Sequence, residues 1–342
     1  MAAAWLTTHT RIRPTTLRSY QIHVDRHLVP HLGRIRLNDL TGRHITAMID
    51  TMAATVNRYG RLPTPATLHR IRATLRSALN AAIREGLLTD NPARHIEVPT
   101  PRRPHAQVWT TGRVHTWQET GQRPTVAVWT TDQTAAFLKH VADDRLAAMW
   151  WLIALRGLRR GEAAGLRWVD VDLDAGILTI EQQRVANGST VAVAPPKTAA
   201  SRRLIALDQH TVRQLREHQR RQRAEQRTAS RAWTASGYVF VTDTGQPLHP
   251  DFLTRRFRHL VHDSGLPPVR LHDLRHGAAS LAHCAGVDLK AVQAQLGHSS
   301  IVLTADTYTS VLTDLLVHAA EATARLVLAA AKRNPERRHH AP

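Results

Sequence analysis

Apolar positions recur with helical spacing through the first hundred residues of the chain. Side chains three and four positions apart predict helices around 17–29, 45–52 and 66–85. The last of these ends at Gly86, and its arginines fall between the apolar positions, so an amphipathic helix with a basic face is expected. Residues 1–90 are therefore predicted to form a small all-helical domain.

A second domain is predicted over 129–332. Helical spacing at 134–141 and 146–155 gives way to three strand-like segments at 176–182, 190–194 and 202–207, with a hairpin turn at Asn187-Gly188. The expected fold class is mainly α with a small antiparallel β-sheet: a helical domain followed by an α+β domain.

Prolines concentrate between these domains, which predicts an interdomain linker over 91–128. The sequence Val-Trp-Thr-Thr occurs twice there, at 108–111 and 128–131, on either side of a short helical segment at 114–119. Two copies of four residues do not define a repeat architecture. Residues 333–342 are expected to form a basic tail.

Five arginines follow steps of three and four along a predicted helix at 208–230 and share one of its faces. That face is either solvated or in contact with phosphate. Apolar residues such as Val212 and Leu215 occur only in the first turns, which slightly favours solvation and predicts that the rest of the helix projects from the body.

The charge narrows the range of partners. Lysine and arginine total 46 against 27 acidic residues, a formal net charge of +19, and all but four of the 46 are arginine. Arginine suits bidentate phosphate contacts, so nucleic acid is favoured over a membrane surface. The longest apolar run, 146–155, is about half of the roughly 20 residues that a bilayer span needs. With no signal-peptide pattern and Cys284 as the sole cysteine, a cytoplasmic protein without disulfides or Cys-x-x-Cys metal sites is expected.

Three segments carry candidate chemistry: 156–166, 272–276 and 296–300, the last followed by Tyr308. His272 and Arg275 are three residues apart on a predicted helix, so both can donate to one anion. Taken singly, such residues are ordinary surface cations or a half-buried tyrosine. Taken together, they form a set suited to metal-free phosphoryl transfer.

Such a transfer needs preplaced donors for the nonbridging oxygens, a nucleophile and a proton for the leaving oxygen. Arginines supply the donors, and nearby cations help a tyrosine hydroxyl, with a pKa of about 10, to attack at neutral pH. Lys197, between the second and third predicted strands, is placed to protonate the leaving oxygen.

These segments resemble the tyrosine recombinases of the phage-integrase type. Gly157–Glu162 resembles the first arginine box, and Pro196–Thr198, leading to Ser201–Arg203, resembles the hairpin lysine segment. Leu271–His276 resembles the His-x-x-Arg box, Leu296–Ser300 the second histidine box, Asp306–Tyr308 the nucleophile segment, and His27–Arg36 part of a helical core-binding domain. The resemblance covers about residues 15 to 325.

The resemblance implies a core-binding domain and a catalytic domain that together clamp double-stranded DNA, and a reaction without metal, ATP or other cofactor. It implies that the tyrosine forms a 3′-phosphotyrosyl link, which the 5′-hydroxyl of a partner strand then reverses. The catalytic residues it implies are Arg159, Lys197, His272, Arg275, His298 and Tyr308.

The family also implies a homo-tetramer on two DNA sites, and it is compatible with an accessory directionality factor. A predicted helix at 315–330 packs either on a neighbouring protomer or on its own domain. The core-binding pattern begins near Met1, which indicates either a simple-site enzyme or a missing arm-binding domain. Integration or excision of a mobile element is favoured over chromosome resolution.

Three alternatives remain open. One is a catalytically silent DNA-binding protein, in which Tyr308→Phe changes nothing. Another is a type IB topoisomerase-like enzyme, which needs no second site. The third treats His272 and His276 as a metal pair next to Asp273, although no third ligand is evident at a useful spacing.

Overall fold

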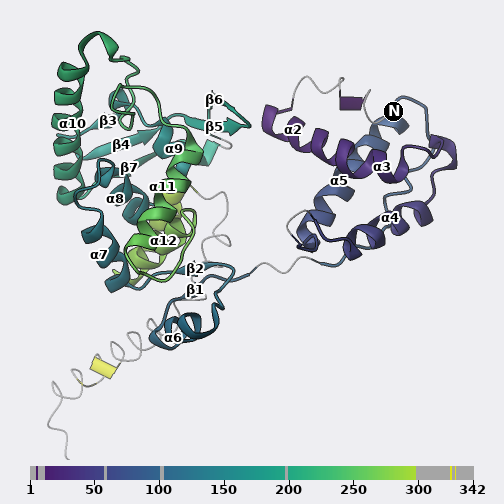
Figure 1. Ribbon diagram of the computed structural model, residues 1–342, viewed down its shortest axis with the longest axis horizontal. Helices are drawn as coiled ribbons and strands as arrows, with labels where there is room; N and C mark the ends of the chain where they lie inside the picture. Colours follow the sequence, from purple (N-terminus) through teal and green to yellow (C-terminus); the bar gives the residue numbers. More distant parts are fainter. Residues whose placement is uncertain are drawn as a thin grey trace, which may run out of the picture. The chain divides into compact units, whose positions relative to one another are not determined.

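The computed structural model describes residues 5–6, 12–57, 60–100, 104–196, 199–297, 324–325 and 328. The chain divides into two units, 1–103 and 104–342, called unit 1 and unit 2 below, and each is described by itself (Figure 1). The predictions for Lys197, His298 and Tyr308 lie outside the described residues. Within the predicted helix at 315–330, only 324, 325 and 328 are described, and these are helical.

Unit 1 is helical, as predicted. Its elements are α2 (Pro14–His23), the π-helical turn η1 (Val24–Leu28), α3 (Val29–Leu32), the 3₁₀ turn η2 (Leu37–Asp39), α4 (Gly42–Ala54) and α5 (Pro65–Arg84). Their apolar faces meet in one core around Ile45, Ile71 and Leu79, which are all fully buried. Burial of these faces stabilises the unit, because short helices are marginal alone in water.

Helix α5 confirms the prediction of an amphipathic basic helix. Thr64 caps its first turn by accepting a hydrogen bond from the Thr67 amide, and Pro65 occupies a position where no N–H donor is needed. Arg70, Arg76 and Arg84 are exposed on the face opposite the core. After the helix, the buried Asn91 side chain donates to the Arg76 carbonyl at 3.0 Å and so fixes the chain that leaves it.

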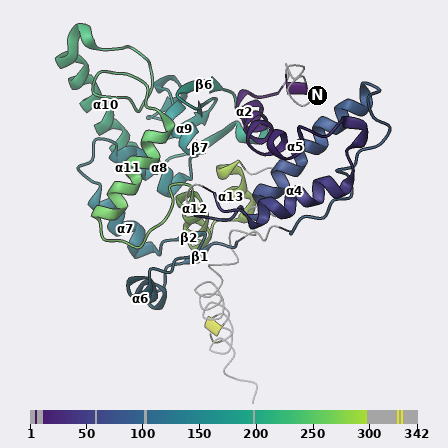
Figure 2. The same ribbon diagram turned by 45° about the vertical axis from the view of Figure 1, so that its right-hand side comes forward.

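Unit 2 surrounds the apolar helix α8 (Ala147–Arg156) with other helices. The bounds of these helices are α6 (Thr111–Thr120), α7 (Thr131–His140), α9 (Arg160–Gly165), α10 (Gln209–Ala229), α11 (Pro250–Asp263), α12 (Asp273–Cys284) and α13 (Leu289–Leu296), with 3₁₀ turns η3 (Trp168–Asp170), η4 (Ala199–Ser201) and η5 (Ser230–Ala232). Seven of the ten α8 residues are buried, and α8 packs against α7, α9, α10 and α12. Figure 2 shows α13 beside α12.

The strands form small sheets, as the predicted fold class requires. An antiparallel sheet has the order β3 (Val171–Asp172), β4 (Ile177–Ile180), β7 (Arg203–Ala206), and a separate antiparallel hairpin pairs β5 (Gln183–Asn187) with β6 (Thr190–Ala194). The predicted segment at 176–182 thus contains only β4. Strand β5 was not predicted because its sequence, Gln-Arg-Val-Ala-Asn, shows no alternation of apolar and polar residues; in the structure all five residues are half-buried.

The duplicated Val-Trp-Thr-Thr segments occupy equivalent structural positions. Their valines end the strands β1 (Gln107–Val108) and β2 (Ala127–Val128), which pair in parallel. The tryptophan after each strand enters the core, and the Trp109 and Trp129 indoles donate to the carbonyls of Pro268 and Pro267 at 3.2 and 2.8 Å. The short sequence duplication therefore corresponds to a local structural duplication.

The threonines of the two segments start the next helices. The Thr110 hydroxyl accepts from the Arg113 amide at the start of α6, and the Thr130 hydroxyl accepts from the Gln133 amide at the start of α7. Residues 107–128, expected to be linker, instead belong to unit 2. The prediction weighted the prolines before residue 107 and the polar residues of this stretch, whereas the two buried tryptophans attach it to the core.

Helix α10 does not project from the body, which corrects the prediction. Its middle turns are held by polar side chains: buried His218 bonds to the Val239 carbonyl at 2.8 Å, and Gln222 donates to the same carbonyl at 3.2 Å. The Trp168 indole donates to Gln222 at 2.6 Å. The arginines of the outer face are exposed: Arg213, Arg216, Arg220, Arg223 and Arg227.

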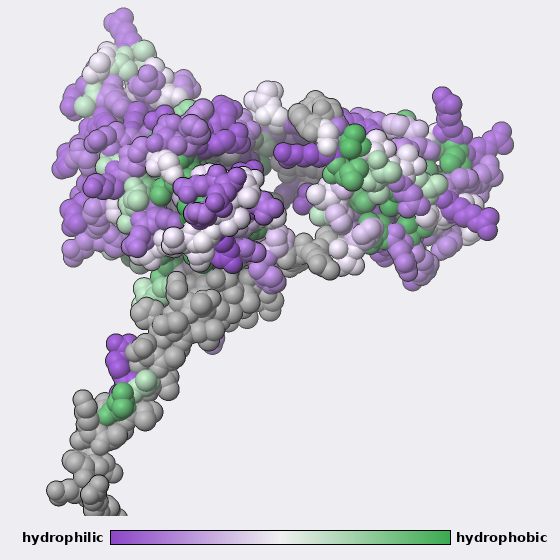
Figure 3. All heavy atoms as spheres, turned by 60° about the horizontal axis from the view of Figure 1, so that its bottom comes forward, coloured by the Kyte–Doolittle hydropathy of each residue, from purple (hydrophilic) through white to green (hydrophobic). Residues whose placement is uncertain are grey.

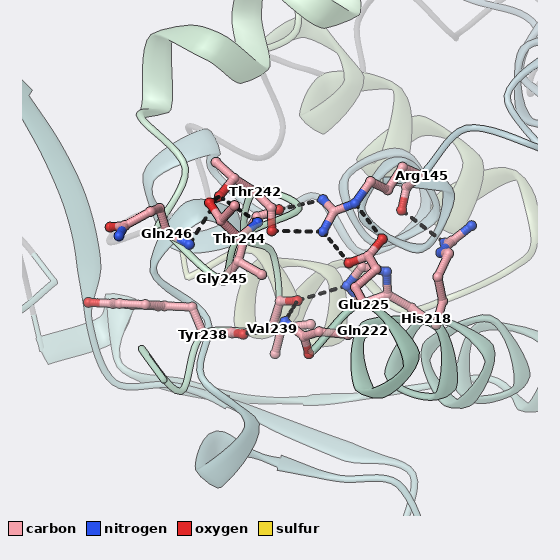
Figure 4. Close-up of polar contacts among 12 residues, drawn as sticks. Arg145, His218, Gln222, Glu225, Tyr238, Val239, Thr242, Thr244, Gly245 and Gln246 are labelled. Carbon is pink, nitrogen blue, oxygen red and sulfur yellow. Dashed lines mark hydrogen bonds and ion pairs between the residues drawn. The ribbon is translucent and has the colours of Figure 1, made fainter. Parts of the chain in front are cut away.

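A second group of polar contacts anchors the same helix (Figure 4). The Arg145 guanidinium pairs with both Glu225 oxygens at 2.7 and 2.5 Å and also donates to the Val241 and Thr242 carbonyls. This arginine therefore joins the turn before α8, helix α10 and the 241–246 loop.

The visible surface is strongly hydrophilic, as the charge predicts. In Figure 3, polar residues cover most of the face shown, and hydrophobic residues form small patches. No helix in the described part of the chain has the length and hydropathy to cross a membrane.

Candidate DNA strand-transfer site

Arg159 is placed by a tight turn between α8 and α9. Gly157 ends α8 with φ +67°, and a Cβ there would lie 2.4 Å from a Leu296 methyl carbon, so glycine meets both a conformational and a packing requirement. The turn sets Arg159 at the N-cap of α9. Its guanidinium donates to Glu162 at 2.6 Å and to the Gly297 carbonyl at 3.2 Å, while 32% of the side chain stays exposed.

Arg275 reaches the same place from α12. It is 3% exposed, and its guanidinium donates to the Gly157 carbonyl at 2.7 Å and to the Leu296 carbonyl. Burial, and then the nearby Arg159 charge, lowers the pKa of Arg275 to about 9, which leaves it protonated at pH 7. Two guanidinium groups thus converge on the end of α13.

His272 lies at the start of α12, and its ring meets the His276 ring edge-on at a centroid distance of 5.6 Å. Desolvation, followed by the charges of His276 and Arg275, lowers the pKa of His272 to about 4. Arg159 lowers it further, so the three predicted residues that are described share one electrostatic environment. His272 is therefore neutral at pH 7, and its ring nitrogens can serve as donor and acceptor.

Sequence reasoning gave no role to Glu162, which lies at the centre of this site. Its side chain is 2% exposed and accepts from the Arg159 amide, from the Arg159 guanidinium and from both terminal nitrogens of Arg203. Burial alone would raise the pKa of Glu162, but the Arg203 hydrogen bonds and the charges of Arg203 and Arg159 outweigh it, so that the pKa is lowered. The spacing of Glu162 three residues after Arg159 was a usable signal, because it matches the reach of an N3 acid to an N-cap amide.

Arg203 carried no comparable local signal. It lies on β7, 41 residues from Glu162, and its side chain is 5% exposed.

The surroundings of Asp273 bear on the alternative in which His272 and His276 bind a metal ion. Both oxygens of Asp273 accept from Arg270, at 2.7 and 2.8 Å, so this carboxylate is committed to an ion pair. Within the described residues, no group of three or more His, Cys, Asp or Glu side chains is arranged to hold a metal ion.

Comparison with known proteins identifies the class. Residues 128–314 match the phage integrase family, and residues 2–53 match the phage integrase N-terminal SAM-like domain. Because the first match covers more than half of the chain, the chain belongs to the phage integrase family. The predicted family and the predicted fold class are confirmed.

Among the relatives, a protein described as "Tyrosine recombinase XerC-like" from Caldanaerobacter subterraneus is 28% identical over 75% of this chain. The putative prophage phiRv2 integrase of Mycobacterium tuberculosis is 26% identical over 87% of this chain. The matches cover 65% and 70% of these relatives, so this chain spans about two thirds of their length.

Solved structures show the same fold. The Tn1549 transposon integrase in complex with transposon right end DNA has a TM-score of 0.68 at 18% identity, covering 93% of this chain and 98% of that chain. A lambda integrase dimer bound to a COC′ core site has a TM-score of 0.59 at 18% identity, covering 90% of this chain and 77% of that chain.

Proposed function

We propose that this chain cuts and rejoins DNA strands through a 3′-phosphotyrosyl intermediate, and that it integrates or excises a mobile element. The observation that carries the proposal is the convergence of Arg159 and Arg275 on the carbonyls of Leu296 and Gly297, immediately before His298, in a chain of the phage integrase family. Two fixed cations at one point suit the negative charge that grows on a phosphodiester under attack.

In the proposed reaction, the Tyr308 oxygen forms a bond to phosphorus as the bond to the 5′ oxygen breaks. Arg159 and Arg275 hold the nonbridging oxygens, and His298 donates a hydrogen bond to the phosphate. Neutral His272 accepts the tyrosine proton, and Lys197 donates a proton to the departing 5′ oxygen. A 5′-hydroxyl from the partner strand reverses these steps, so the phosphate ester energy is conserved and neither ATP nor a metal is consumed.

The working assembly is proposed to be a homo-tetramer on two DNA duplexes, with an accessory factor setting direction. A lambda integrase tetramer bound to a Holliday junction is among the similar structures. The mobile-element role is supported by relatives described as a prophage integrase and as the ICEBs1 integrase.

The test is covalent trapping with the full chain. Duplexes with a randomised central segment are selected for binding, sequenced, and remade with a nick that prevents religation after cleavage. Wild-type protein is expected to form a denaturant-resistant adduct in the presence of chelator, and Tyr308→Phe is expected to bind the same duplex without forming it.

The outcomes separate the alternatives. Tight binding with no wild-type adduct would favour the silent DNA-binding protein. Loss of the adduct on chelation would contradict metal independence. Relaxation of a plasmid carrying one site, with no exchange between two sites, would favour the topoisomerase-like alternative.

A further inference from the structure

Arg203 is an almost completely buried cation with every strong contact inside the protein. Its terminal nitrogens pair with both Glu162 oxygens at 3.0 and 2.9 Å, Nε donates to the Gln295 carbonyl at 2.6 Å, and Nη1 also donates to the Ser201 carbonyl at 3.1 Å. These contacts use four of its five N–H donors and pair its charge with a buried carboxylate, so Arg203 is committed to contacts within the protein.

These contacts join three separate segments at the site. Glu162 belongs to α9, whose N-cap is Arg159; Gln295 belongs to the last turn of α13; and Ser201 ends the 3₁₀ turn that precedes β7. The packing around this junction is close, because a Cβ on Gly297 would lie 2.9 Å from Arg203 Cδ and 2.7 Å from the Ala200 carbonyl oxygen.

The Glu162 carboxylate lies between two guanidinium groups with different access. One belongs to buried Arg203, and the other to Arg159, which keeps about a third of its side chain exposed. A carboxylate held in a bidentate pair has a fixed position and orientation. Arg203 therefore fixes the position at which the Glu162 carboxylate accepts hydrogen bonds from Arg159.

We infer that Arg203 is a positioning residue for strand cleavage: it fixes the carboxylate that orients Arg159 and ties that carboxylate to the end of α13. The inference rests on the proposed function for its activity readout. Lysine at this position keeps the charge but cannot pair with both carboxylate oxygens and reach the two carbonyls, so the conservative change is expected to rescue only part of the loss.

The chain supplies a matched control in Arg145. Arg145 also makes a bidentate pair with one glutamate and donates to two backbone carbonyls, but its partner Glu225 anchors α10 and does not contact Arg159 (Figure 4). Loss of either arginine removes the same kinds of contact. Of the two arginines, only Arg203 pairs with the carboxylate that contacts Arg159.

The experiment compares Arg203→Lys and Arg203→Gln with Arg145→Lys and Arg145→Gln in the full chain. Urea unfolding, binding of the selected duplex and the rate of adduct formation at saturating duplex are measured. The Arg203 variants are expected to bind DNA nearly as the wild type does while the rate falls about 10- to 100-fold, least for lysine, because a small displacement of a catalytic group has effects of this size. The Arg145 variants should lose stability and keep the rate per folded molecule.

Equal rate losses for the two pairs of variants, or weakened binding with an unchanged rate at saturation, would overturn the inference. If Arg203→Gln does not fold, the lysine variants alone decide. A second readout does not need activity: hydrogen exchange at the start of α9, where the Arg159 amide donates to Glu162 at 2.9 Å. If the wild type forms no adduct, the proposed function fails, while faster exchange there in the Arg203 variants alone still supports the positioning role, and unchanged exchange overturns it.

Discussion

Gly297 ends α13 with φ +63°, and its carbonyl accepts from the Arg159 guanidinium at 3.2 Å. Gly286, just after α12, has a similar φ of +79°, yet an added Cβ there would meet nothing within 4 Å. Alanine at either position adopts the same unfavourable backbone conformation. Only Gly297→Ala also brings its Cβ into steric conflict with neighbouring atoms. Comparing the two variants therefore separates the cost of the backbone conformation from the cost of the steric conflict.

The magnitudes follow from this difference. A left-handed alanine costs about 1–2 kcal/mol, partly offset by about 0.4–1 kcal/mol from a less flexible unfolded chain, so Gly286→Ala should lose about 1 kcal/mol. At Gly297, the Ala200 oxygen must retreat from 2.7 Å to an ordinary contact of 3.4 Å or more. That shift strains the hydrogen bonds that Arg159 and Arg203 donate to the end of α13. Loss of one hydrogen bond from a charged group adds about 1.5–3 kcal/mol to the loss of stability.

The assay is urea unfolding of both variants together with the adduct rate of each. We expect Gly297→Ala to lose about 2.5–4 kcal/mol in total and to cleave at least tenfold more slowly per folded molecule, while Gly286→Ala cleaves as the wild type does. Equal losses of stability in the two variants, with wild-type cleavage by Gly297→Ala, would refute the assignment of this glycine to the site.

Three further predictions concern the supporting structure. Acidification from pH 6.5 to 4 should cost up to about 3 kcal/mol through His218, because burial lowers its pKa to about 4 and the unfolded chain binds a proton that the folded chain rejects; an unchanged acid slope in His218→Asn would contradict this. Trp129→Phe leaves the Pro267 carbonyl without its donor and should cost about 2–3 kcal/mol in urea unfolding; a loss below about 1 kcal/mol would show the bond to be dispensable. Asn91→Ala removes the hydrogen bond to the Arg76 carbonyl and should cost about 2 kcal/mol; an unchanged unfolding midpoint would exclude that anchoring role.

The features predicted best were those with a local signal. The 3.6-residue spacing of apolar positions predicted both ends of α5 to within one residue. The spacing is clear because α5 contributes only one of its faces to the core of unit 1. Likewise, the His-x-x-Arg spacing marked Arg275, and the resemblance of 157–162 to the first arginine box marked Arg159; the structure brings both to one point.

Features held by distant polar contacts were not predicted. The part of α10 after its first turns looked solvent-facing because residues such as His218 and Gln222 are polar, but these two bond to the carbonyl of Val239 in a loop that the sequence pattern does not connect to them. Arg203 was noted only as part of the segment that follows Lys197, and no pattern assigned it a role; the fold places it against Glu162. Hydropathy records a residue's preference for water and carries no information about a partner far away in sequence.

The paired strands β1 and β2 set the point at which this protein can be recombined with its relatives in the laboratory. Because Trp109 and Trp129 both bond to carbonyls at 267–268, the stretch from residue 107 onward packs with unit 2 as one folded piece. A chimera that takes a foreign helical domain should therefore be joined before Pro104, where the two units divide. A junction at 128, placed by the proline-rich composition alone, would sever one of the two tryptophan anchors from the module it serves.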